Sequence, residues 1–252
     1  MALPFPVPMN PVSPSGEVQQ PDLFQAGAGG DEPRPRAAAG EDLAELAAAC
    51  AGCRRCGLVL GRQQVVVSRG NPAARLMVIG EGPGAQEDAQ GLPFVGRAGQ
   101  LLDQMLASVG IDSNRDAYIC NVVKCRPPDN RKPTAEEMAA CTPWLERQIQ
   151  LVDPPVILLA GATALEGVLG VKGGITRLRG QWRQGSGAVL GGRWLLPILH
   201  PSYLLRNPSR QQGSPKWLTW QDLQDVRRRL NQLAGGGVPA GSGEDPSLPS
   251  GL

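Results

Sequence analysis

Four short runs that are apolar at almost every position constrain the fold of this chain most strongly. They are Leu76–Glu81, Tyr118–Val123, Val156–Gly161 and Trp194–Leu199. Continuous rather than alternating hydrophobicity over this length is typical of strands covered on both faces in a parallel sheet. Apolar residues with helical spacing predict helices over 98–109, 134–152, 163–169 and 218–233. The alternation predicts a three-layer α/β/α fold around a four-stranded parallel sheet.

Proline and glycine gather at the two ends of the chain. Residues 1–40 hold eight Pro and five Gly, and residues 234–252 hold three Pro and six Gly. Such segments bury too little apolar surface to offset their chain entropy, so both are predicted to be disordered tails. One domain is therefore expected between residues 41 and 233.

The charge distribution narrows the classes of function. The two tails hold two basic and six acidic residues, so the domain carries a net charge of +6 where the whole chain carries +2. This modest basic excess is compatible with a polyanionic partner. No apolar run reaches the roughly 18 residues of a membrane span, and the start MALPFPVPMNP lacks the regions of a signal peptide. We therefore expect a cytoplasmic protein rather than a membrane protein or a secreted disulfide scaffold.

Four of the six cysteines have a spacing that favours a metal group. Cys53 and Cys56 form a CxxC pair, and Cys125 and Cys141 form a second, wider pair. Without a secretion signal, clustered cysteines indicate metal binding rather than disulfides. A CxxC turn presents two thiolates to one ion or cluster, and two distant cysteines complete a tetrahedral set. The spacing alone does not separate zinc from an iron–sulfur cluster.

The remaining two cysteines are weaker candidates. Cys50 extends the first pair to CxxCxxC, so it competes with Cys53 or Cys56 as a ligand. Cys120 lies inside a predicted buried strand, where a free cysteine usually acts as a small hydrophobic residue.

A glycine-rich turn, Glu81-Gly82-Pro83-Gly84, follows the first predicted strand. Turns at the carboxyl ends of parallel strands are where α/β sheets bind ligands, because backbone N–H groups can approach the ligand there. The sequence matches neither the P-loop nor the dinucleotide-binding motif, and an ordinary strand-to-helix turn is an equal alternative. Three carboxylates lie within reach of this edge: Glu81, Glu87 and Asp88.

Two further residues at this sheet edge suit a nucleobase. Phe94, the one Phe of the domain, lies between glycines in GLPFVG and could stack on a base or anchor its loop. His200, the one histidine, directly follows the fourth strand and so lies at the same edge as Glu81 and Asn121. A neutral imidazole can donate a hydrogen bond to an oxyanion that forms on a leaving group.

The residues after His200 suit contact with a nucleic acid. Leu204 and Leu205 are followed by Arg206. An apolar tip beside an arginine can fill the gap left by an extruded base while holding a phosphate. We predict these three residues as a wedge and clamp.

Several of these motifs together resemble a known family. EGPG at 81–84, GLPFVG at 91–96, NVVKCRPPDNRKPT at 121–134 and HPSYLLRNP at 200–208 are similar to the family 4 uracil-DNA glycosylases, the iron–sulfur type of bacteria and archaea. The resemblance covers about 49–233, with the motifs in the family's order. It implies a monofunctional enzyme of base excision repair, which removes uracil from single- or double-stranded DNA and leaves an abasic site. It also implies a nucleoid-associated protein, and we expect it to be a monomer.

The resemblance also implies roles for individual residues. A structural 4Fe–4S cluster would be bound by Cys53, Cys56, Cys125 and Cys141, in a register that excludes Cys50. Flipped-out uracil would stack on Phe94, and the Asn121 amide would read its N3–H and O4. The backbone of Glu81, Gly82 and Pro83 would line the pocket, and His200 would bond O2 of the departing uracil anion.

At two positions the sequence departs from the best-studied branch of that superfamily. Gly82 and Gly84 stand where that branch has an Asp that orients the water and a Tyr that blocks the thymine methyl. Glu81 is the first candidate for placing the water or supporting the cationic sugar. Glu87 is the candidate for excluding the thymine methyl.

Two alternative functions would require different sequence features. Covalent capture of DNA through a histidine after the second strand is excluded, because residues 124–141 contain no histidine. The alternative function is a non-catalytic iron–sulfur or zinc DNA-binding module of the replication machinery. Absence of site residues would favour that module, but Phe94, Asn121 and His200 are all present. The tails are candidate segments for recruiting replication or repair proteins.

Overall fold

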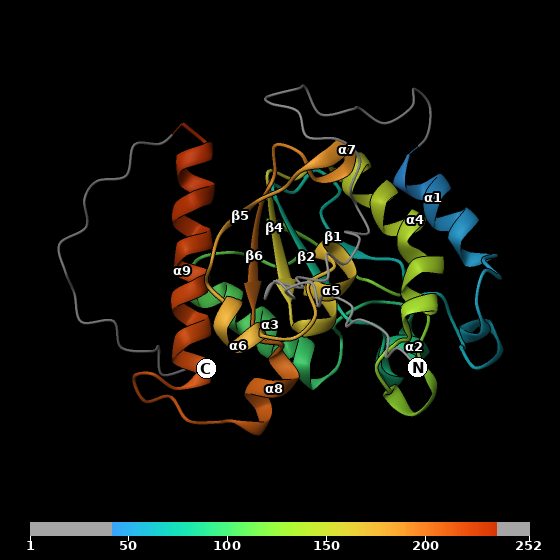
Figure 1. Ribbon diagram of the computed structural model, residues 1–252, viewed down its shortest axis with the longest axis horizontal. Helices are drawn as coiled ribbons and strands as arrows, with labels where there is room; N and C mark the ends of the chain where they lie inside the picture. Colours follow the sequence, from blue (N-terminus) through green and yellow to red (C-terminus); the bar gives the residue numbers. More distant parts are fainter. Residues whose placement is uncertain (1–41, 236–252) are drawn as a thin grey trace, which may run out of the picture.

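The computed structural model describes residues 42–235 (Figure 1). The predicted tails lie outside the described residues, except for residues 234 and 235, which follow the last helix. Within the described part of the chain, no helix is long and apolar enough to cross a membrane.

A single mixed sheet forms the centre of the domain, in the strand order β1-β3-β2-β4-β6-β5. The four central strands are parallel, and β1 and β5 each add two residues antiparallel at an edge. The strands are β1 (Arg69–Gly70), β2 (Leu76–Gly80), β3 (Ala117–Asn121), β4 (Val156–Ala160), β5 (Arg183–Gln184) and β6 (Trp194–Ile198). The predicted parallel core is confirmed; the edge strands were not predicted, because two residues carry no readable pattern.

Helices cover both faces of the sheet. Figure 1 shows α9 on one side of the strands and α1 and α4 on the other. The α-helices are α1 (Leu43–Ala51), α2 (Ala85–Gln90), α3 (Arg97–Ser108), α4 (Ala135–Val152), α5 (Ala162–Leu169), α6 (Ile175–Leu178), α7 (Gly187–Leu190), α8 (Pro201–Arg206) and α9 (Pro215–Leu233). Two short 3₁₀ helices, η1 (Gly57–Leu60) and η2 (Pro128–Asn130), lie in loops.

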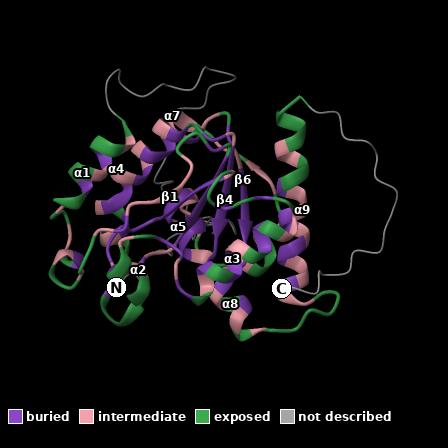
Figure 2. Ribbon diagram, turned by 180° about the vertical axis from the view of Figure 1, so that it is seen from behind, coloured by how far each residue is buried: buried purple, intermediate pink, exposed green. Residues whose placement is uncertain are grey.

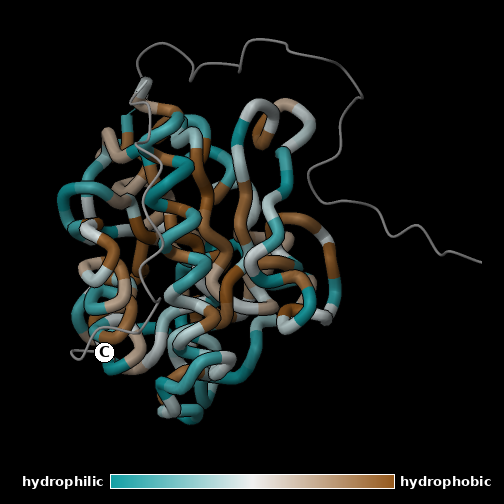
Figure 3. Tube along the Cα trace, turned by 90° about the vertical axis from the view of Figure 1, so that its left-hand side faces the viewer, coloured by the Kyte–Doolittle hydropathy of each residue, from teal (hydrophilic) through white to brown (hydrophobic). Residues whose placement is uncertain are grey.

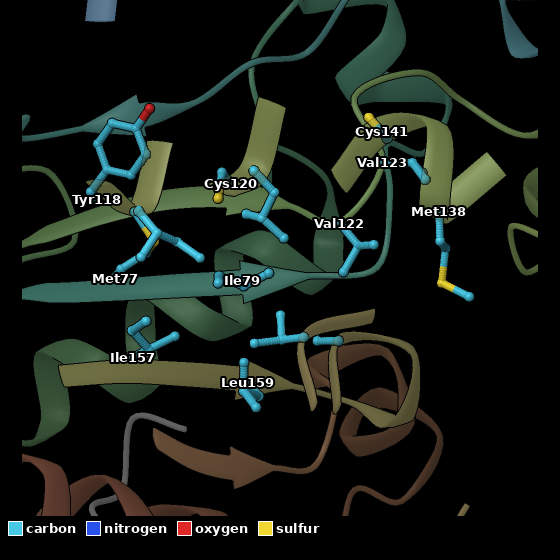
Figure 4. Packing of buried hydrophobic residues seen from close by; sticks show 14 of the residues in the cluster. Met77, Ile79, Tyr118, Cys120, Val122, Val123, Met138, Cys141, Ile157 and Leu159 are labelled. Carbon is cyan, nitrogen blue, oxygen red and sulfur yellow. The ribbon is translucent and has the colours of Figure 1, made fainter. Parts of the chain in front are cut away.

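The strands supply side chains to two separate cores. Met77, Ile79, Cys120 and Ile157 belong to the core on the α4 and α5 side, while the alternate residues pack toward α3 and α9. Figure 4 shows these four residues together with Met138 and Cys141 of α4. All five residues of each of β2, β3 and β4 are buried, and the strands form the interior in Figure 2 and the apolar centre of the trace in Figure 3. Burial on both faces explains why these runs are apolar throughout.

A capping box marks the start of α4, the longest predicted helix. The Thr134 hydroxyl accepts a hydrogen bond from the Glu137 backbone N–H at 3.2 Å, and the Glu137 carboxylate accepts from the Thr134 N–H at 2.8 Å. This reciprocal capping box satisfies two N–H groups that the first helical turn leaves unpaired. Arg131 pairs with Glu137 at 2.6 Å, which ties the loop after β3 to the start of α4.

Candidate functional site

The carboxyl ends of β2 and β3 meet at Gly80, which pairs with Asn121 in register. A Cβ at Gly80 would lie 2.4 Å from the ring of Phe94 and 2.5 Å from the Asn121 side-chain oxygen. Because Gly80 has no side chain, the Phe94 ring and the Asn121 amide can both occupy the space beside its Cα. The sheet thus brings together two of the residues that the sequence predicted for base binding.

Phe94 is held in an unusual loop conformation. Its φ is +55°, a left-handed value that is uncommon outside glycine, and Arg69 donates to the carbonyls of Pro93 (2.9 Å) and Phe94 (3.4 Å). The side chain is 7% exposed and packs with the core on the α3 side of the sheet. Its ring lies 5.9 Å from the His200 ring, centroid to centroid. Phe94 is therefore a core residue that also reaches the sheet edge, and not an exposed platform.

His200 is the N-cap of α8, and its hydrogen bonds define its tautomer. The backbone N–H of Ser202 donates to Nδ1 at 3.1 Å, and the Ser202 hydroxyl lies 2.7 Å from the same atom. A backbone N–H can only donate, so Nδ1 carries a lone pair and the proton of the neutral ring is on Nε2. Burial lowers the pKa of His200 to about 4, aided by the positive charge of Arg206 and opposed by Glu87. At neutral pH the ring is an uncharged Nε2–H donor.

The end of β4 packs directly against this histidine. Gly161 has a φ of +98°, and a Cβ there would lie 2.9 Å from the His200 Cβ. Two residues further on, the Thr163 hydroxyl donates to the Glu81 carboxylate, which lies at the end of β2. Glu81 is half-buried and Thr163 is 4% exposed. Thr163 could not be predicted as a site residue from the sequence, because its partner is far away in the chain.

The other two carboxylates at this edge, those of Glu87 and Asp88, accept hydrogen bonds from backbone N–H groups. Glu87 accepts hydrogen bonds from the N–H groups of Val95 (3.0 Å), Gly96 (2.8 Å) and Gly84 (3.2 Å). It therefore ties the EGPG turn to the GLPFVG loop. Asp88, which is 1% exposed, accepts from the backbone N–H of Gln63 at 2.9 Å. The role of Glu87 in excluding the thymine methyl stays a prediction.

The orientation of helix α8 contradicts one part of the predicted wedge. Leu204 is fully buried in the core on the α3 side, so it presents no side chain to a nucleic acid, and the wedge prediction is wrong for this residue. Leu205 is half-buried and Arg206 is exposed. The exposed apolar side chain of the helix is that of Tyr203, at 36%. Leu204 lies on the same buried face of α8 as Pro201, three residues earlier.

A second site lies between α1, the loop after β3 and α4. The four predicted ligands, Cys53, Cys56, Cys125 and Cys141, line one pocket, and Cys50 lines it too. Figure 4 shows Cys141 beside Val123, at the far end of the core from Tyr118. Cys120 lies elsewhere, fully buried in β3, as expected of a small hydrophobic residue.

The surroundings of this pocket suit anionic sulfur. Arg62 donates to Cys125 Sγ at 3.1 Å, the Trp144 indole N–H to Cys53 Sγ at 3.3 Å, and the Lys124 backbone N–H to Cys141 Sγ at 3.3 Å. Burial raises the pKa of the Cys141 thiol to about 11, so a metal is needed to hold it as a thiolate. The donor set and its N–H groups fit a thiolate-bound cluster. Within residues 42–235, no three His, Cys, Asp or Glu side chains converge on a single-ion site.

Comparison with known proteins decides the family. The sequence model of the uracil DNA glycosylase superfamily matches residues 67–224. The chain is 51% identical over 163 residues to the type-4 uracil-DNA glycosylase of Thermotoga maritima, a match that covers 63% of this chain and 81% of that protein. The chain belongs to the type-4 uracil-DNA glycosylases. It is also 38% identical to the type-4 enzyme of Sulfurisphaera tokodaii, over 62% of this chain and 73% of that protein.

Similarity extends more weakly to a neighbouring group of the superfamily. The chain is 30% identical over 215 residues to the type-5 uracil-DNA glycosylase of Thermus thermophilus, covering 73% of this chain and 94% of that protein. The higher identity to the Thermotoga protein supports placement in the type-4 group.

The tautomer of His200 can be observed directly, because this type-4 chain contains one histidine. We expect the imidazole ¹⁵N signals to show protonated Nε2 and unprotonated Nδ1, with no titration between about pH 8 and pH 5.5. The folded pKa lies below the ordinary value of 6.5. His200 therefore stabilises the fold fully above about pH 6.5, and this contribution is lost as the pH falls toward about 4. A midpoint near the ordinary value would contradict the buried donor.

Proposed function

We propose that this protein hydrolyses the N-glycosidic bond of deoxyuridine in DNA, releasing free uracil and leaving an abasic site in an unbroken strand. The observation that carries the proposal is the juxtaposition of Phe94, Asn121 and a neutral His200 at one edge of the sheet. A non-catalytic DNA-binding module would have no need of a neutral imidazole donor at this point. We therefore do not favour that alternative.

Base recognition rests on groups that approach Gly80. Uracil extruded from the helix would stack on the face of the Phe94 ring at this sheet edge. The Asn121 amide would accept from N3–H and donate to O4, an edge that cytosine presents with donor and acceptor reversed. A wrong base would leave the buried amide unpaired, which gives strong discrimination. The backbone of Glu81, Gly82 and Pro83 would complete the pocket.

Catalysis would proceed through departure of a uracil anion. The bond between C1′ and N1 breaks, and its electron pair moves into the uracil ring and onto O2. The Nε2–H of His200 donates to that oxygen, and an uncharged donor stabilises the anion without losing its proton. Water then adds to the oxocarbenium-like C1′ and loses a proton to solvent or to Glu81. The Thr163 hydroxyl fixes the Glu81 carboxylate for placing this water.

Four cysteines would bind a 4Fe–4S cluster: Cys53, Cys56, Cys125 and Cys141. When bound, the cluster supplies a cross-link between the segment after α1 and the loop after β3, and its four thiolates leave no iron site open to substrate. Cys50 borders the same pocket, and we assign it no ligand role. Cys120 is too deep in β3 to take part.

The partner is uracil-containing DNA, single- or double-stranded, and the basic domain attracts its phosphates. We place the protein in the cytoplasm at the nucleoid, where that substrate lies, and infer that it acts as a monomer. A lyase would need an accessible activated amine. Lys124 is buried and Lys132 is paired with Glu166, so neither offers a free amine, and we infer that cleavage is monofunctional.

Replacement of His200 tests the catalytic role. We expect His200→Ala to lower the single-turnover cleavage rate by roughly 10² to 10³, the usual effect of losing an oxyanion donor. Affinity for uracil DNA should fall much less, because phosphate contacts dominate it. Quench assays and fluorescence anisotropy measure the two quantities. A wild-type rate in this variant would assign His200 a purely structural role.

The surface of α8 can be tested with paired and single-stranded substrates. We expect Tyr203→Ala and Leu205→Ala each to slow cleavage of paired uracil more than of single-stranded uracil. A single strand has less stacking and pairing to break, so it needs the wedge less. Leu204→Val is the matched control, since it changes only the buried neighbour. Equal slowing on both substrates would argue against a wedge on this helix.

The cluster is tested by iron content. Protein purified without oxygen should be brown, with about four iron per chain and little zinc. Replacing Cys53, Cys56, Cys125 or Cys141 by Ala should remove the colour and lower the solubility, while Cys50→Ala and Cys120→Ala should keep the colour. A colourless protein loaded with zinc would refute the cluster and leave the glycosylase proposal standing.

A further inference from the structure

Lys124 is a buried charge that the mechanism does not use. Its side chain is 1% exposed, one of the largest fully buried side chains of the domain. The ammonium donates to the backbone carbonyl of Asn121 at 2.5 Å. A buried ammonium normally requires a negative partner. The ion pairs described within residues 42–235 include no carboxylate partner for it.

The negative charge nearest to Lys124 would come from the cysteine pocket. Lys124 lines that pocket, and its own backbone N–H donates to Cys141 Sγ. A cluster core bound by four thiolates carries a net negative charge, which would compensate the ammonium. The backbone N–H of Lys124 therefore faces the cysteine pocket, while its ammonium binds the Asn121 carbonyl.

The carbonyl that Lys124 holds lies where the β2–β3 ladder ends. Val122 N–H donates to the Gly80 carbonyl at 2.9 Å, and Val123 N–H to the Glu81 carbonyl at 3.2 Å. The peptide that follows Asn121 is thus fixed on its N–H side by β2 and on its carbonyl side by Lys124. Rotation of this peptide would move the Asn121 amide away from its position beside Gly80.

We propose that Lys124 is a positioning residue that couples the cluster pocket to the base-reading amide of Asn121. The negative cluster would compensate the charge of the ammonium, and the ammonium holds the Asn121 carbonyl, so the geometry of uracil recognition depends on the metal site. This role rests on the proposed uracil excision. Through Lys124, a cluster whose iron sites are all occupied by thiolates would still influence the position of Asn121 and so the cleavage rate.

A double-mutant cycle tests the route through Asn121. We expect Lys124→Met to slow single-turnover cleavage of a single-stranded uracil oligonucleotide by about 10- to 100-fold, the cost of a misplaced contact. In an Asn121→Ala background the same substitution should change the rate by less than about twofold, because the group it positions is gone. Lys132→Met, a neighbouring lysine paired with Glu166, is the control and should keep the wild-type rate. Equal effects in both backgrounds would overturn the proposal.

The reduction potential of the bound cluster gives an independent readout. Removing a positive charge beside a negative cluster makes reduction harder, so Lys124→Met should shift the potential to lower values while iron content stays at the wild-type level. Lys132→Met should leave the potential unchanged. An unchanged potential in Lys124→Met would refute the contact between this charge and the cluster.

A second variant covers the case in which Lys124→Met does not fold. Lys124→Gln keeps an N–H donor for the Asn121 carbonyl but carries no charge. We expect it to retain more of the cleavage rate than Lys124→Met and to show the lowered potential; loss of cleavage with a wild-type potential would contradict the coupling. Failure of the wild-type protein to release uracil would instead refute the proposed function, and the potential would still test the Lys124–cluster contact.

Discussion

The close approach of β2 and β3 at Gly80 is the constraint on which the site depends. Parallel pairing sets Gly80 opposite Asn121, and the missing side chain leaves room for both the Phe94 ring and the Asn121 amide. Any larger residue at this point would have to displace the Phe94 ring or the Asn121 amide, because a Cβ at Gly80 would lie within about 2.5 Å of each. The loops that carry Glu81 and His200 then follow from strand order, because all four parallel strands end at the same edge.

Around this point, polar groups of the protein mainly fix the backbone and the tautomer of His200. Glu87 joins two loops through three N–H groups, and Ser202 leaves the imidazole of His200 with its proton on Nε2. Such groups are oriented before substrate arrives, so little reorganisation is needed when charge develops on a leaving base. The cysteine pocket is preoriented in the same way, because N–H groups of Arg62 and Trp144 already donate to cysteine sulfur atoms.

The sequence predicted the features of the fold that depend on hydrophobic periodicity and on the order of elements along the chain. The four parallel strands and the shared edge of Glu81, Asn121 and His200 followed from periodicity and chain order. The wedge prediction failed for Leu204, because the exact phase of a six-residue helix decides which leucine faces the core. Thr163 was not predicted, since its partner Glu81 lies 82 residues away. Contacts between distant segments depend on packing, which a single sequence does not display.

The most direct test of this account is the release of free base from DNA. Cluster-loaded protein is incubated with matched oligonucleotides that carry uracil, thymine or cytosine at one position, and the small-molecule fraction is separated by chromatography. The account predicts one free uracil per uracil site, an unbroken strand until alkali is added, and no thymine or cytosine. Folded, iron-containing protein that binds the uracil oligonucleotide and releases no uracil would contradict it.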